Sequence, residues 1–127
     1  MRWPSLLLLG GLLFGALLAA EAVRPVERVF AGEVVDLSCY LVSGAHGPEV
    51  VDAGRACLAK GSSCAILTDE GQLVLPLVDP KASQMDLAPF LARRVRARGT
   101  AYGKNGVTGL LITKLEPLPA EPEPKTP

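Results

Sequence analysis

The pattern of apolar and polar positions predicts a chain built mainly from β-strands. Segment 26–41 predicts one long first strand, with Val35 and Cys39 on one face and Val34 and Tyr40 on the other. Because both faces carry apolar residues, we expect this strand to bend between two sheets. Gly32 is a natural position for the bulge that such a bend requires.

Two hairpins are predicted further along the chain. Their strands are the segments 64–68, 72–78, 95–102 and 107–115. The first pair meets at the turn Asp69-Glu70-Gly71, and the second meets at Asn105-Gly106, a dipeptide that strongly favours a tight reversal. Small residues alternate with arginines in segment 95–102, which indicates a half-buried strand with a charged outer face.

Two short helices are predicted between these strands. Segment 48–60 begins with Pro48, carries acidic residues in its first turn and is followed by Gly61. These are the residues expected at the start and at the end of a helix. Segment 84–91 predicts a second, brief helix between the third and fourth strands. This order of elements predicts a mainly β fold, a five-stranded OB-like Greek-key barrel, with a small β-sandwich as the alternative.

The two ends of the chain differ from the part between them. Residues 6–20 carry no charge, follow Arg2 and precede Ala20-Glu21-Ala22, which is the pattern of a secretory signal peptide over residues 1–22. The apolar stretch is short for a spanning helix, and an uncleaved N-terminal anchor is the alternative. We therefore expect an OB-like domain over 23–117, located in the periplasm or outside the cell, and a Pro-rich disordered tail over 118–127.

Charge argues against nucleic acid as a partner. The chain has 13 basic and 13 acidic residues, so it has no general attraction for polyanions. A local basic cluster is nevertheless present, comprising Arg93, Arg94, Arg96, Arg98 and Lys104. We interpret it as a solvated strand face that discourages edge pairing, with an anionic partner protein or lipid headgroup as the functional alternative.

The three cysteines are the most informative candidates for chemistry. In an exported domain Cys39, Cys57 and Cys64 predict one disulfide and one free thiol, and the sequence leaves open which two of them pair. The alternative is a zinc or copper site formed by these cysteines together with His46. The cysteine spacing matches no recognised ligand pattern.

The chain resembles a group of small exported OB-fold-like bacterial proteins of uncharacterised function. The resemblance lies in four stretches, at residues 32–41, 44–48, 67–71 and 87–90, the first of which contains the sequence Cys39-Tyr40-Leu41. It implies a pattern on the inserted helix of a His, a Cys three residues later and a second Cys four residues after that. Here Val50 and Ala53 occupy the first two of these positions, and only Cys57 keeps the pattern.

The function expected first is that of an exported, non-catalytic binding module without a cofactor. The chain has one histidine and no arrangement of nucleophile and base that the strand pattern would bring together, so we do not expect an enzyme. The ligand would be another envelope protein or a small molecule. The expected binding surface comprises Tyr40, Tyr102, Arg96 and Arg98, with His46 near the same mouth of the barrel.

Two other classes of function remain open at this point. One is a metal- or redox-handling accessory protein that uses the cysteines and His46. The other is a small structural subunit tethered to a membrane complex, which requires that the leader is retained as an anchor. Contact with a membrane is expected only in that second case.

Overall fold

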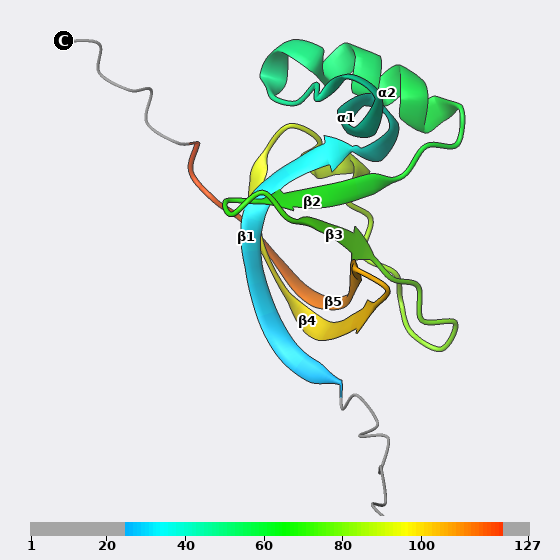
Figure 1. The fold of residues 1–127 in the computed structure, drawn as a ribbon, viewed down its shortest axis with the longest axis vertical. Helices are drawn as coiled ribbons and strands as arrows, with labels where there is room; N and C mark the ends of the chain where they lie inside the picture. Colours follow the sequence, from blue (N-terminus) through cyan, green and yellow to red (C-terminus); the bar gives the residue numbers. More distant parts are fainter. Residues whose placement is uncertain (1–24, 121–127) are drawn as a thin grey trace, which may run out of the picture.

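The computed structural model describes residues 25–120, which form a closed barrel of five strands (Figure 1). The strands are β1 (Val26–Asp36), β2 (Cys64–Thr68), β3 (Leu73–Pro76), β4 (Arg94–Lys104) and β5 (Val107–Pro117). Around the barrel they follow the order β1-β2-β3-β5-β4, in which β3 and β5 are parallel and the other pairs are antiparallel. The predicted mainly β, OB-like barrel is confirmed.

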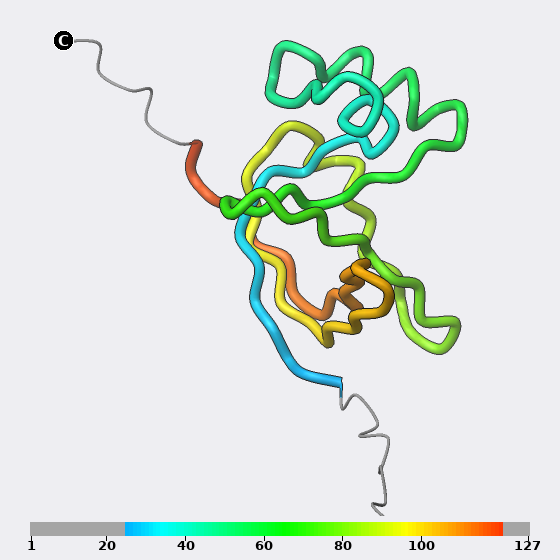
Figure 2. The backbone as a smooth tube through the Cα atoms, in the orientation of Figure 1, coloured from blue at the N-terminus to red at the C-terminus, as the bar shows by residue number. Residues whose placement is uncertain are grey.

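Strand β1 takes part in both halves of the barrel, as its two apolar faces predict. It pairs with β4 from Val26 to Glu33 and with β2 from Gly32 to Asp36. A Cβ atom at Gly32 would lie 2.1 Å from the carbonyl oxygen of Leu67, so only glycine permits this close approach of β1 and β2. The curved path of β1 along the barrel is visible in Figure 2.

The interior of the barrel is aliphatic, in keeping with the low aromatic content of the chain. The largest fully buried side chains are Ile66, Leu110, Val34, Val35, Val74 and Val95. Leu87 and Leu91, from the segment before β4, join this cluster, and Phe30 and Phe90 pack against it. Tight packing of these side chains makes the barrel the rigid part of the molecule.

The first strand is shorter than predicted. It ends at Asp36, and the chain passes directly into helix α1 (Leu37–Ser43), so Cys39 and Tyr40 lie on a helix instead of a strand. The carboxylate of Asp36 accepts a hydrogen bond from the Cys39 amide at 2.8 Å, which caps the start of the helix. Gly44, in the left-handed conformation with φ 68°, ends it.

The predicted inserted helix is confirmed, as the turn η1 (Pro48–Val50) followed by α2 (Val51–Ala59). The helix predicted over 84–91 is reduced to the single 3-10 turn η2 (Ala88–Phe90). Two features explain the reduction: the Asp86 side chain accepts the Ala88 amide hydrogen and turns the chain, and Pro89 has no amide hydrogen to donate. Helices α1 and α2 lie together at one end of the barrel (Figure 2).

The predicted signal peptide, residues 1–22, and positions 121–127 of the predicted tail lie outside the described residues. At the start of that tail, the Leu118 amide donates to the carbonyl oxygen of Arg94 at 2.9 Å. Within residues 25–120, no helix has the length and apolar character needed to cross a membrane.

Candidate functional site

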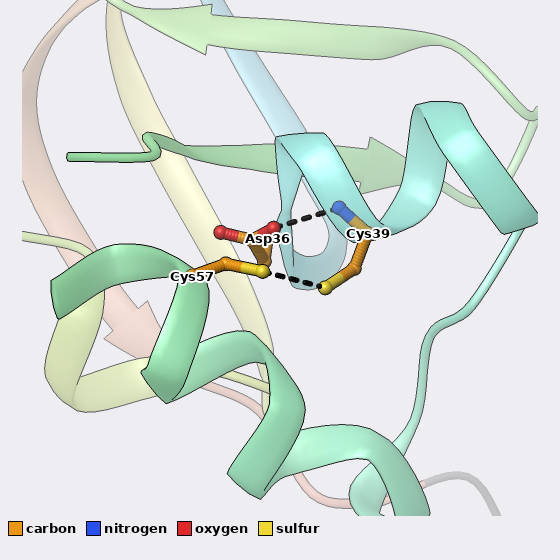
Figure 3. Close-up of side chains that lie close together, drawn as sticks. All are labelled: Asp36, Cys39 and Cys57. Atoms are coloured by element: carbon orange, nitrogen blue, oxygen red, sulfur yellow. Dashed lines mark hydrogen bonds between the residues drawn. The ribbon is translucent and has the colours of Figure 1, made fainter. Parts of the chain in front are cut away.

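Two thiols and a carboxylate meet where β1 becomes α1 and α2 passes alongside (Figure 3). The Sγ atoms of Cys39 and Cys57 are 3.3 Å apart. The possible ligand atoms of Asp36, Cys39 and Cys57 all lie within 4.8 Å of one another. Of the four residues predicted as metal ligands, the structure therefore brings together two, Cys39 and Cys57, and adds Asp36.

The packing of α2 explains how Cys57 reaches this position. Gly54 is the one buried residue of α2. A Cβ atom at Gly54 would lie 3.0 Å from Cδ2 of Leu91 and 3.4 Å from Cβ of Asp36, so the missing side chain allows α2 to approach the end of β1 closely. Cys57 follows three residues later on the same face of the helix, opposite Cys39.

Asp36 is the most deeply buried of the three groups, with 3% of its surface exposed. One carboxylate oxygen, Oδ1, accepts the Cys39 amide hydrogen. The other, Oδ2, is buried and has no hydrogen-bond partner among the described residues. A buried acceptor without a partner costs about 1–3 kcal/mol, so a hydrogen-bond donor or a cation that reached this oxygen would remove that cost.

The surroundings of Cys39 favour its neutral thiol. The pKa of Cys39 is raised to about 11, first by the hydrogen bond with Cys57, then by burial and by the nearby Asp36. All three cysteines are free, because even the close pair is well beyond the S–S bond length of about 2.05 Å. At neutral pH the Cys39 sulfur therefore carries a proton.

Cys64 is separate from this pair. It is 7% exposed and begins β2, and burial followed by the charges of Asp36 and Asp86 raises its pKa to about 11. A buried thiol that is hard to ionise is a poor nucleophile. Of the pairings that the sequence left open, only Cys39 with Cys57 is brought into contact.

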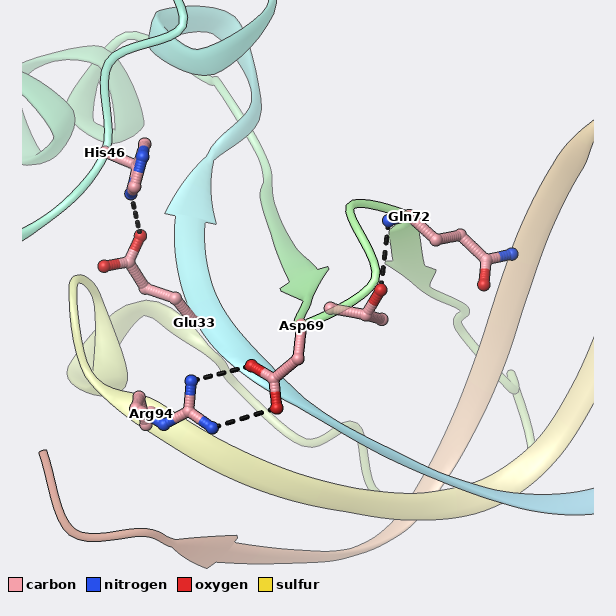
Figure 4. Close-up of polar contacts among 6 residues, drawn as sticks. Glu33, His46, Asp69, Gln72 and Arg94 are labelled. Atoms are coloured by element: carbon pink, nitrogen blue, oxygen red, sulfur yellow. Dashed lines mark hydrogen bonds and ion pairs between the residues drawn. The ribbon is translucent and has the colours of Figure 1, made fainter. Parts of the chain in front are cut away.

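His46 lies beside the site without joining the cluster of ligand atoms. It lines the same small cavity as Asp36 and Cys39. Its Nδ1 atom is 3.0 Å from Oε2 of Glu33 (Figure 4), and its ring contacts Tyr40 edge-on at a centroid distance of 6.2 Å. His46 is thus held by the barrel wall and by α1.

The residues expected to form a binding surface are not gathered in one place. Tyr40 lies on α1, which follows the last residue of β1. Tyr102 lies on β4 next to Ala101, and Ala101 pairs with Val26, the first residue of β1. The two tyrosines are therefore at opposite ends of the barrel.

The three arginines of β4 are paired with acidic neighbours. Arg96 and Arg98, which are half exposed on the barrel wall, approach Glu116 and Glu27 at 3.8 and 3.9 Å. Lys114, at 2.8 Å from Glu116, lowers the pKa of that carboxyl. Arg94 binds both carboxylate oxygens of Asp69, at 2.7 and 3.0 Å (Figure 4).

Comparison of the chain with family models, with curated proteins and with solved structures finds no match. Asp36 is the member that sequence reasoning missed as part of a site. The available signal was a carboxylate three residues before a cysteine, at the end of an alternating apolar run.

Proposed function

We propose that this protein is an exported accessory protein that carries out thiol–disulfide exchange through Cys39 and Cys57. The observation that carries the proposal is the 3.3 Å contact between their sulfur atoms. Export, which the N-terminal apolar segment predicts, would place the pair in surroundings where disulfides form and persist. The binding module expected first from the sequence has less support, because Tyr40 and Tyr102 lie at opposite ends of the barrel.

The reaction is an exchange with a disulfide of a partner protein or of glutathione. A thiolate of the pair attacks one sulfur of that disulfide, and the other partner sulfur leaves as a thiolate. The second sulfur of the pair then loses its proton, attacks the mixed disulfide and releases the remaining partner thiolate. In total the pair loses two electrons and two protons and forms one S–S bond, and the partner gains them as two thiols.

The hydrogen bond between the two thiols restrains the start of the exchange. Because the pKa of Cys39 is raised to about 11, first by its hydrogen bond with Cys57, its thiolate is scarce at neutral pH. Bond formation then requires the sulfurs to approach by roughly 1 Å from their present separation, which rotation of the two side chains can supply.

The proposal is tested by counting thiols in the mature chain after equilibration in glutathione buffers of increasing oxidised fraction. We expect three free thiols in the reduced form and one in the oxidised form, with a peptide linking Cys39 to Cys57 in the oxidised form. Cys57→Ser should abolish the internal bridge, and Cys64→Ser should leave it intact. Three free thiols in every buffer, or a bridge that contains Cys64, would refute the proposal.

Export is tested separately. Expression in a bacterium with an envelope, followed by N-terminal sequencing of the exported product, should give a chain that begins at Val23. A product that begins at Met1 and sediments with membranes would instead support the tethered subunit.

A further inference from the structure

We infer that the reduced site binds one Zn²⁺ ion through the sulfurs of Cys39 and Cys57 and the free carboxylate oxygen of Asp36. The inference deepens the proposed function, since the same two sulfurs would be a ligand pair when reduced and a closed disulfide when oxidised. Zinc would thus be held in one redox state and released in the other.

The separations of the three groups fit this ion. With Zn–S bonds of about 2.3 Å and tetrahedral angles, two sulfur ligands stand about 3.8 Å apart. The sulfurs of Cys39 and Cys57 are 3.3 Å apart, and the carboxylate of Asp36 lies within 4.8 Å of both. An opening of the sulfur pair by about 0.5 Å would bring the two sulfurs to the separation expected of zinc ligands.

The unpartnered oxygen of Asp36 is an independent reason to place a cation here. Its Oδ2 atom is buried and accepts no hydrogen bond within residues 25–120. Asp36 as a whole has 3% of its surface exposed. A bound cation would supply the missing partner. Meanwhile Oδ1 stays bonded to the Cys39 amide, which fixes the orientation of the carboxylate as outer-shell hydrogen bonds do in metal sites.

The types of donor atom select the metal. Two thiolates disfavour magnesium and calcium, which prefer oxygen ligands, and favour zinc or copper(I). A carboxylate as the third ligand favours zinc over the softer copper(I) ion. Three protein ligands leave one coordination position for water, an arrangement typical of sites that exchange a ligand rather than of closed structural sites.

The binding experiment uses the mature chain, reduced with a phosphine and titrated with ZnCl₂ against a chromophoric chelator. We expect one Zn²⁺ per reduced chain and none per chain after oxidation by oxidised glutathione. Titration with Co²⁺ should give thiolate-to-cobalt charge-transfer absorption, which reports sulfur ligation directly.

Four variants identify the ligands. Asp36→Asn keeps an oxygen that can cap α1 but removes the charge, and it should weaken zinc binding by about 10- to 100-fold while still forming the disulfide. Cys57→Ser should abolish both properties. Cys64→Ser and His46→Ala are the matched controls, because the sequence also suggested these residues as ligands, and both should bind zinc as the parent chain does.

The outcomes separate the two proposals. A reduced parent chain that binds no stoichiometric zinc but forms the Cys39–Cys57 bridge overturns the inference and leaves the proposed function standing. A parent chain that binds zinc but forms no Cys39–Cys57 bridge overturns the proposed function and leaves the zinc site standing. Zinc binding that survives Asp36→Asn unchanged, or that is lost in His46→Ala, overturns the assignment of the third ligand.

Discussion

The barrel and the helical insertion of residues 37–59 differ in how they are held. In the barrel, Val34, Ile66 and Leu110 have at most 1% of their surface exposed. In the insertion, α1 buries no residue and α2 buries only Gly54. Leu41 and Val42 of α1 remain 65% and 87% exposed.

The difference shows that the buried apolar core lies in the barrel, whereas the candidate site lies where the barrel meets the insertion. Hydrophobic stabilisation grows with the apolar area removed from water, so the barrel supplies most of it. The sulfurs of Cys39 and Cys57 lie on this lightly packed insertion. A cross-link or a bound ion therefore has more to add in the insertion than in the barrel. Four predictions test this contrast, in order of decreasing expected effect.

The largest effect is expected from truncation of the barrel core. Ile66→Ala removes buried methyl groups and leaves a cavity, so the free energy of unfolding should fall by about 2–5 kcal/mol. Leu41→Ala, in the insertion, should change it by less than about 0.5 kcal/mol. Equilibrium unfolding in urea measures both. Equal losses in the two variants would show that the insertion is as tightly packed as the barrel.

The next effect is expected from oxidation of the thiol pair. A bridge between Cys39 and Cys57 closes a loop across a separation of 18 residues, which should stabilise the oxidised chain by about 3 kcal/mol relative to the reduced chain. The comparison is made by urea unfolding with and without reductant. Cys57→Ser should unfold identically in both conditions, and a parent chain that behaves in the same way would contradict the prediction.

A smaller effect is expected at the point where β1 crosses between its two partners. Gly32→Ala places a Cβ atom 2.1 Å from the Leu67 carbonyl oxygen, and the resulting strain should cost about 1–3 kcal/mol. Gly103→Ala is the control, because its Cβ would meet its nearest atom, the Val107 oxygen, at 3.9 Å. Thermal unfolding should separate the two variants, with Gly103→Ala close to the parent.

The smallest effect is expected at the Asp69–Arg94 ion pair on the barrel wall. The hydrogen bonds from Arg94 lower the pKa of Asp69 below its ordinary value of 3.8, against an opposing effect of burial. The pair therefore stabilises the fold above that value, and the contribution is lost as pH falls through the lowered pKa. With 45% of the Asp69 side chain exposed, we expect less than about 1 kcal/mol. Urea unfolding at decreasing pH measures the loss, which Asp69→Asn should remove.

The strands were predictable because each depends on local patterns. Alternation and the turns at Asp69-Glu70-Gly71 and Asn105-Gly106 located both hairpins. Helix α1 was missed because its apolar residues fit a strand period as well as a helix period. The signals that could have revealed it were its caps, Asp36 before the helix and Gly44 after it.

The candidate site was only half predictable. Its cysteines could be named from the sequence, but the choice of Cys57 over Cys64 as the partner of Cys39 depends on how α2 packs. That packing depends on Gly54, whose neighbour Leu91 is 37 positions away along the chain. A single carboxylate at the end of a strand is ordinarily solvated, so the position of Asp36 three residues before Cys39 was too weak a signal to assign it to the site.

The absence of a loop between β1 and α1 has a mechanical consequence. Asp36 is at once the last residue of the strand and the cap of the helix, so no hinge separates the Cys39 sulfur from the barrel wall. The amide of Val34 donates to Arg93, and its carbonyl oxygen accepts from Ala92. A displacement of Cys39 should therefore reach Val34 and Val35 of the barrel wall, and the NMR signals of these two residues should shift when the Cys39–Cys57 bridge closes.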